Sequence, residues 1–192
     1  MKGKVKIIDI ESNGLLEEML DHTSFPYKLK SDAKLHVVVI RDAYTDEVLV
    51  AEQEKITKEW MQKSLEGCEI LAHHNGVKFD LITLKLFGVL DYYVGYPGES
   101  DTLFGKPIKI IDTLILSRLF YPDRYNGHSL ESWGERTGAE KLDFRWESIA
   151  QGLIPKDSPK GFEFKEWSPL MTTYCIADTL VNKNTFFALA EE

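Results

Sequence analysis

Cysteine is scarce in this sequence. The chain has 192 residues and two cysteines, Cys68 and Cys175, which lie far apart and outside any C-x-x-C pair. Structural zinc sites and disulfide frameworks need more cysteines at closer spacing, so neither is indicated. Unpaired thiols fit a reducing, cytosol-like compartment.

Long apolar runs are also absent. The N-terminal segment MKGKVKIIDIESNG holds one short apolar run and already carries two acids, and no stretch approaches the length that crosses a membrane. We therefore expect a soluble, cytoplasmic protein with no targeting segment and no membrane partner. Its 43% hydrophobic and 28% charged residues are typical of one compact domain, which we expect to span residues 1–192.

Basic residues are in the minority. The sequence has 23 Lys and Arg against 31 Asp and Glu, which gives a net charge of −8 and a pI of about 5.2. This balance argues against a protein that coats nucleic acid through a broad basic face. It does not exclude an enzyme that holds a few nucleotides at a strand end, because bound divalent ions supply positive charge there.

Strand and helix signals predict an α/β protein. β-Branched residues predict strands at 4–10, 35–41 and 47–51 that form an antiparallel meander. Capping residues and apolar spacing then predict helices and strands in alternation: helices at 57–65, 78–87, 113–120, 129–138 and 169–190, and strands at 69–72 and 108–111. A mixed sheet with three antiparallel first strands, flanked by helices, is the pattern of an RNase H-like fold.

Two segments lack this periodicity. Residues 92–107 are dense in Gly, Pro, Tyr and Ser, so we expect a long loop there. Residues 139–163 contain prolines and few periodic apolar positions, which predicts an irregular, partly helical excursion.

The first candidate site element is the pair Asp9 and Glu11. Residues two apart on a strand leave the same face of the sheet, and two carboxylates there repel each other unless a cation lies between them. The alternative is a strand end with two solvated acids, and in a chain this acidic the pair alone is weak evidence.

Two further elements carry acids. Asp80 ends the stretch HHNGVKFD, in the first turn of the predicted helix, where complementing the helix dipole is an adequate alternative role. Tyr174 and Asp178 are four residues apart, so they share one face of the last helix. The alternative there is a packed tyrosine beside a surface acid.

In this order the three elements resemble the three motifs of the DEDD exonucleases. Asp9 and Glu11 match the first motif, Asp80 the second, and Tyr174 with Asp178 the third, in which the tyrosine indicates the DEDDy subgroup. The stretches DIESNGLL, HHNGVKFD, IDTLILSRLF and GHSLESWGERTG also resemble the N-terminal proofreading exonuclease domain of family A DNA polymerases from short-tailed phages.

The resemblance implies a 3′→5′ exonuclease that shortens single-stranded DNA ends to nucleoside 5′-monophosphates in proofreading or DNA processing. Its partners would be single-stranded DNA 3′ ends and a DNA polymerase domain or subunit, in the host cytoplasm if a phage encodes it. Four hard carboxylates select Mg²⁺ or Mn²⁺ and can hold two such ions about 4 Å apart. By the same resemblance the four acids are the metal ligands and Tyr174 orients the attacking water.

Contacts to the substrate are also carried over from the resemblance. Leu15 has the spacing of the residue that wedges between terminal bases, and Ser12 and Asn13 offer hydrogen bonds; core burial is the alternative for Leu15. Asn75 would contact the sugar or phosphate, or serve as a turn residue. His128 is expected at the cleft mouth rather than in a histidine metal cluster.

The sequence also departs from the family and leaves alternatives open. Phe79 stands where polymerase exonucleases often carry tyrosine, and the resembling proteins continue into a polymerase where this chain reaches Glu192, so we expect a stand-alone exonuclease or an excised domain. Asp112 is explained as a helix cap. The alternative functions are a 3′→5′ exoribonuclease and a non-catalytic module that binds nucleic acid or docks on a polymerase.

Overall fold

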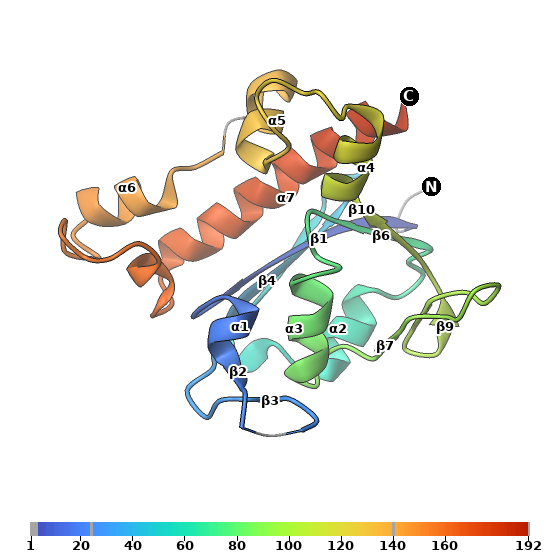
Figure 1. Ribbon diagram of the computed structural model, residues 1–192, viewed down its shortest axis with the longest axis horizontal. Helices are drawn as coiled ribbons and strands as arrows, with labels where there is room; N and C mark the ends of the chain where they lie inside the picture. The colour runs from blue at the N-terminus through green and yellow to red at the C-terminus, as the bar shows by residue number, and fades with distance from the viewer. Residues whose placement is uncertain (1–3, 24, 140, 192) are drawn as a thin grey trace.

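A mixed β-sheet forms the centre of the molecule (Figure 1). The computed structural model describes residues 4–23, 25–139 and 141–191; residues 1–3 at the start of the N-terminal segment, 24, 140 and 192 lie outside. Within the described residues the main sheet has five strands in the order β10-β6-β1-β4-β5: Lys109–Asp112, Ile70–His73, Val5–Ser12, Leu35–Asp42 and Val48–Glu52.

The strand pairing agrees with the sequence. β1 pairs antiparallel with β4 and β4 with β5, so the predicted meander is confirmed. On the other side β1 pairs parallel with β6, and β6 with β10. The sheet is therefore mixed, as predicted, and its first three strands in sequence order, β1, β4 and β5, are antiparallel.

Alternation along β1 and β4 divides the core into two layers. Ile8 and Ile10 of β1 pack with Val38 and Ile40 of β4 against α2 (Lys58–Ser64) and α3 (Asp80–Leu86). The intervening residues face α7 (Pro169–Ala190), where Val37 contributes to a second cluster. A period of two thus gives each face of the sheet its own helices.

Helix α7 lies across one face of the sheet and is the longest element. It contacts β1 and β4, and α4 (Thr113–Phe120), α5 (Leu130–Thr137) and α6 (Phe144–Ala150) pack on it. Its predicted bounds are confirmed, since Ser168 caps its N-terminus by accepting from the Met171 amide and Pro169 occupies the first turn. Within the described residues no helix is long and apolar enough to span a membrane.

Several predicted helix ends are also confirmed by their caps. The side chains of Thr57, Asp112 and Ser129 each accept a backbone N–H at the start of α2, α4 and α5. Gly138 ends α5 with a φ of 70°, a conformation that costs glycine little. The capping side chains therefore predict these helix ends from the sequence.

The structure differs from prediction in three segments. Residues 92–107, expected as a loop, form the small sheet β7 (Tyr92–Tyr93), β8 (Thr102–Leu103) and β9 (Lys106–Pro107). The predicted excursion contains α6 and leads into the short 3-10 helix η2 (Phe162–Phe164). Unpredicted short elements follow β1 and β5: α1 (Leu16–Met19), the β2–β3 pair (Leu20–Asp21 with Lys28–Leu29) and the 3-10 helix η1 (Gln53–Lys55).

Candidate active site

The first two carboxylates lie on the face of β1 that is covered by α7. Ile7, two residues before Asp9, belongs to the core cluster that includes Phe186 of α7, so alternation directs Asp9 and Glu11 toward the same helix. Glu11 is only 8% exposed. The register with β4 shifts between Glu11 and Ser12, an irregularity of the kind that often lies beside functional sites.

The third carboxylate, Asp80, is positioned by a tight turn between β6 and α3. Gly76 lies in this turn, where a Cβ atom would come within 2.5 Å of the His73 ring and 2.9 Å of Asp80 Oδ2. Asn75 has a φ of 66°, and its amide donates to Asp112 Oδ1. A glycine at 76 therefore lets the backbone approach closely enough to bring buried Asp80 to the site.

Helix α7 supplies Tyr174, Cys175 and Asp178. Cys175 Sγ donates to Asp9 Oδ2 at 3.3 Å, and the ligand atoms of Asp9, Glu11 and Cys175 lie within 4.8 Å of one another. The sequence reading missed Cys175 as a neighbour of the acids. A signal existed, because Cys175 precedes Asp178 by three residues and so shares its helix face.

Lys141 is a second residue that the sequence reading missed. Its Nζ lies 2.7 Å from Asp178 Oδ2 and 4.8 Å from the centroid of the Tyr174 ring. The other oxygen, Asp178 Oδ1, is buried and accepts no hydrogen bond of ordinary geometry within the described residues, although the Tyr174 hydroxyl is close enough to lower the pKa of Asp178. Lys141 precedes α6 in residues 141–143, which form no helix or strand, so no periodic pattern in the sequence predicts where its side chain points.

Loss of hydration and mutual repulsion make this a costly place for negative charge. The pKa of Asp9 is raised first by burial and then by the charges of Asp178 and Asp80, and that of Glu11 by burial and then by Asp9. Burial raises the pKa of Asp80 to about 7. For Asp178, burial raises the pKa while Lys141 lowers it.

Tyr174 stays protonated in these surroundings. Its pKa is raised far above the ordinary value by burial, and then by the negative charges of Asp178 and Glu11. A phenol that keeps its proton is a hydrogen-bond donor and aligner rather than a general base at neutral pH.

The residues fit a divalent cation. A carboxylate cluster with raised pKa values and one unpartnered buried oxygen gains stability when a cation is placed among its oxygens. Oxygen donors suit Mg²⁺, Mn²⁺ and Ca²⁺, whereas the Cys175 thiol is strongly disfavoured as a thiolate because burial raises its pKa, followed by the charge of Asp9. Asp9 and Glu11, whose oxygens lie within 4.8 Å of each other, could hold such an ion, and the charges of Asp80 and Asp178 act on both of them.

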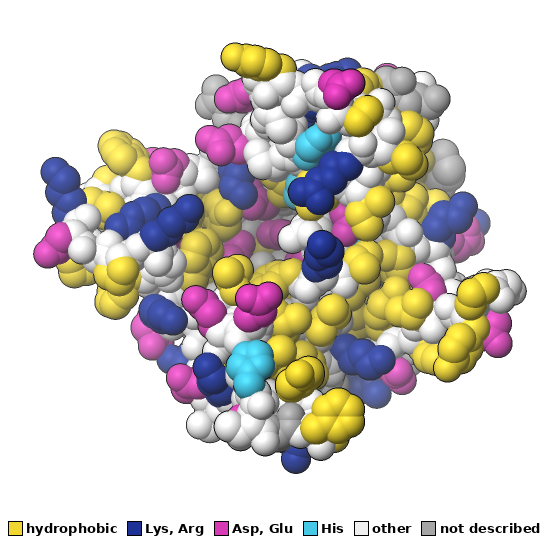
Figure 2. Space-filling view, viewed as in Figure 1, with side chains coloured by type: hydrophobic (Ala, Val, Ile, Leu, Met, Phe, Trp, Pro, Cys, Tyr) yellow, Lys and Arg dark blue, Asp and Glu magenta, His cyan; other side chains and the backbone are white. Residues whose placement is uncertain are grey.

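A mostly apolar groove of about 400 Å³ includes Glu11 in its lining. Ser12, Leu15 and Glu18 line it from the segment around the end of β1, and Lys160, Glu163 and Phe164 line it from the segment before α7. Figure 2 shows this face of the molecule hollowed between the part around α6 and the main body, with acidic side chains in the hollow and basic ones on the α6 part. The excursion before α7 thus supplies one wall of a cleft.

The expected substrate contacts are placed unevenly around this groove. Leu15 is 66% exposed, so the alternative of core burial is wrong. The hydroxyl of buried Ser12 donates to the Gly14 carbonyl. The Asn13 side chain is occupied between the Asp32 carbonyl and the Lys34 amide. None of these contacts tests binding, which stays a prediction.

Asn75 lies in the turn that carries Asp80, and His73, His74 and His128 are engaged with protein groups. His73 Nδ1 accepts from the Gly76 amide, and His74 Nδ1 lies 2.8 Å from Thr113 Oγ1. His128 bonds Ser117 instead. Within the described residues no group of side chains spaced to hold a metal ion includes a histidine. Asp112 caps α4 as expected.

Comparison with known proteins identifies the fold. No protein-family model and no curated protein matches the chain. A solved structure described as the apo form of a nuclease aligns over 98% of this chain and 72% of its own, with 20% identity and a TM-score of 0.55. NrnC of Brucella melitensis aligns over the same shares, with 18% identity and a TM-score of 0.54. Together with the sheet order, these similarities show that the chain has an RNase H-like α/β fold.

Proposed function

We propose that this chain is a metal-dependent 3′→5′ exonuclease that removes nucleoside 5′-monophosphates from single-stranded DNA ends. One observation carries the proposal: Asp9 and Glu11 of β1 lie close enough to Asp80 of α3 and Asp178 of α7 for the four charges to act on one another, beside Tyr174, and within the described residues one buried oxygen of Asp178 has no hydrogen-bond partner. The likeness of the fold to a structure described as a nuclease supports it.

Each residue has a role that follows from its surroundings. Asp9, Glu11, Asp80 and Asp178 would hold Mg²⁺ or Mn²⁺, two ions in the full site. When bound, such ions supply an activated water and stabilise the oxygen that leaves the phosphorus. Tyr174, which keeps its proton, orients the water for attack on the terminal phosphodiester. Water adds to phosphorus, the bond to the 3′ oxygen breaks, and that oxygen takes up a proton.

The groove suits the 3′ end of a single-stranded nucleic acid. Exposed Leu15 and half-buried Phe164 offer apolar surfaces to a base, and Lys160 on the same groove is available to a phosphate. Its volume of about 400 Å³ suits one or two nucleotides rather than a duplex. We propose Ser12, Asn13, Asn75 and His128 as further contacts, and a DNA polymerase as the partner in the cell.

The test uses a 5′-labelled single-stranded DNA and a matched RNA, each incubated with Mg²⁺, with Mn²⁺ or with EDTA. We expect stepwise shortening of the DNA from its 3′ end with either ion and none with EDTA. Asp9→Ala with Glu11→Ala should reduce the rate by several orders of magnitude while the circular dichroism spectrum stays unchanged. Tyr174→Phe should retain measurable activity, because it removes one contact to water.

The other outcomes separate the alternatives. Faster shortening of the RNA would make the chain an exoribonuclease. Binding of either strand without shortening in Mg²⁺ or Mn²⁺ would make it a non-catalytic module. Cleavage of a circular single strand would show an endonuclease instead.

A further inference from the structure

Lys141 has a special position among the basic residues. Among residues 4–23, 25–139 and 141–191, it is the one basic side chain in an ion pair with a carboxylate of the candidate site. Its ammonium donates to Asp178 Oδ2 at 2.7 Å, and its charge also acts on Asp9 and Glu11. Its ammonium therefore contacts one of the carboxylates that would hold a metal ion.

The two side chains of the ion pair differ in exposure and in how far they can move. The Asp178 side chain is 5% exposed and comes from the middle of the long helix α7, whereas the Lys141 side chain is 26% exposed. Lys141 belongs to residues 141–143, which form no helix or strand before α6, and its stem has four rotatable bonds. The carboxylate is fixed, and the ammonium can leave it without unfolding an element.

A second place for the ammonium lies nearby. Lys141 lines a hollow of about 300 Å³ together with Glu131 and Asp143, and Arg145, which also lines it, is paired with Glu163 at 2.8 Å. These two acids lie outside the carboxylate site, so an ammonium that leaves Asp178 can meet negative charge and water there.

We propose that Lys141 is an exchangeable counterion, whose ammonium holds Asp178 when no divalent ion is bound and leaves Asp178 when one binds. This inference rests on the proposed metal site. Lys141 then stabilises the folded protein without metal and competes with the metal for the same carboxylate. If the ammonium is on Asp178 in about 70–90% of metal-free molecules, it weakens the apparent metal affinity by about three- to tenfold.

The test compares the full chain with Lys141→Met, Lys141→Arg and a control, Lys34→Met. Lys34 also pairs with an acid at 2.7 Å, but its partner Glu166 lies outside the site, so the control removes the same charge. Thermal melts are recorded over a titration with Ca²⁺ and with Mn²⁺, after initial melts in EDTA. No turnover is needed for this measurement.

We expect Lys141→Met to melt below the wild type in EDTA and to show a given metal-induced rise in melting temperature at about three- to tenfold lower metal concentration. Lys141→Arg should stay close to the wild type in EDTA, and Lys34→Met should need the same metal concentration as the wild type for that rise. An unchanged or higher concentration for Lys141→Met would overturn the counterion role of Lys141, as would an equal decrease in Lys34→Met. If no ion shifts any of the four proteins, the metal site itself is wrong.

A measurement on the wild type covers the case in which Lys141→Met does not fold. The intact protein is treated briefly with an acetylating reagent, with and without saturating Ca²⁺, and labelling at each lysine is read by peptide mass spectrometry. We expect Ca²⁺ to raise the labelling of Lys141 relative to that of Lys34. Constant or reduced labelling of Lys141, alongside a Ca²⁺-induced rise in melting temperature, would reject the exchange and leave the metal site standing.

Discussion

Gly76 shows how tightly individual residues are fitted around Asp80. A methyl group there would lie 2.5 Å from the His73 ring and 2.9 Å from the Asp80 carboxylate, and the buried ring has no room to retreat. We expect Gly76→Ala to lower the free energy of unfolding by roughly 1–3 kcal/mol, the usual range for overpacking, as measured by urea denaturation.

The matched control is Gly14→Ala. Its added methyl group would lie 2.8 Å from Glu18 Oε2, the end of an exposed side chain that can shift at the loss of one hydrogen bond from the Leu15 amide. We expect a change of less than about 1 kcal/mol there. Equal costs at the two positions would show that the close approach at Gly76 is not what fixes the turn.

His74 should give the protein a measurable sensitivity to acid. Burial lowers its pKa from 6.5 to about 4, although Asp112 opposes the shift. Below pH 6.5 the unfolded chain binds a proton that the folded protein does not accept until about pH 4, so this stabilisation is complete above pH 6.5 and is lost as the pH falls.

We therefore expect the difference in free energy of unfolding between the wild type and His74→Asn to narrow by ~2–3 kcal/mol from pH 6.5 to 4.5. The comparison cancels the titration of the acids, which both proteins share. His22→Asn, at an exposed position, is the control and should show a much smaller change. A constant difference for His74→Asn would mean that the folded protein accepts the proton as easily as the unfolded chain.

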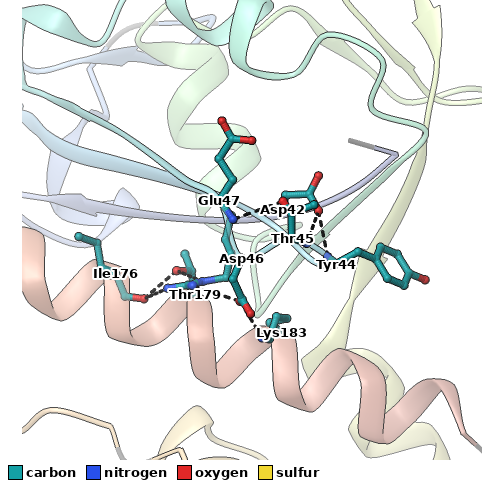
Figure 3. A network of polar contacts seen from close by, with 9 residues as sticks. Asp42, Tyr44, Thr45, Asp46, Glu47, Ile176, Thr179 and Lys183 are labelled. Carbon is teal, nitrogen blue, oxygen red and sulfur yellow. Dashed lines mark hydrogen bonds and ion pairs between the residues drawn. The ribbon is translucent and has the colours of Figure 1, made fainter. Parts of the chain in front are cut away.

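Among the elements, α7 must be held in register with the sheet because it carries Tyr174 and Asp178. Buried Arg41 of β4 makes this connection: its guanidinium donates to Thr179 Oγ1, to the Ile176 carbonyl and to Asp46 in the β4–β5 turn. Lys183 of α7 reaches the same Asp46 at 2.7 Å. Figure 3 shows Asp46 above the helix, between Thr179 and Lys183.

These two cations should differ in their effect on stability. Arg41→Leu removes three hydrogen bonds from a buried position and should cost roughly 1–3 kcal/mol in urea denaturation. Lys183→Met removes one bond to Asp46, whose side chain is 56% exposed, and should cost less than about 1 kcal/mol. A larger loss in Lys183→Met would place the main attachment of α7 at its exposed edge.

The elements also show what a sequence can reveal and what it cannot. Thr57, Asp112, Ser129 and Gly138 act on backbone groups within a few residues, so their helix ends were predictable. The β2–β3 pair and the small β7–β9 sheet each contain strands of two residues, too short to show alternation.

The same reasoning applies to the site. Asp9 with Glu11, and Tyr174 with Asp178, are pairs fixed by strand and helix periods, and their shared faces could be predicted. Lys141 meets Asp178 across 37 residues, through an irregular stretch that sets its direction only in the folded chain. Long-range contacts of this kind leave no local pattern.

At the scale of the whole molecule, the acids of three distant segments converge in a chain that is already negative, with a net charge of −8. Folding gathers Asp9, Glu11, Asp80 and Asp178 and removes much of their water, whereas unfolding separates them. The metal-free site thus lowers stability, and binding of a divalent ion should raise it.

The size of this effect can be measured as a shift in melting temperature. Mg²⁺ at about ten times its dissociation constant should add ~1.4 kcal/mol, a shift of a few degrees for a domain of this size. Asp9→Asn removes one charge from the cluster, so in EDTA at pH 8 it should melt at or above the wild type, yet it should lose most of the response to Mg²⁺. Asp123→Asn, at an exposed position away from the site, makes the same charge change and should respond like the wild type. Equal Mg²⁺ responses in all three proteins would show that Asp9 is not a ligand and would leave Asp9 and Glu11 as largely buried acids that hold no metal ion.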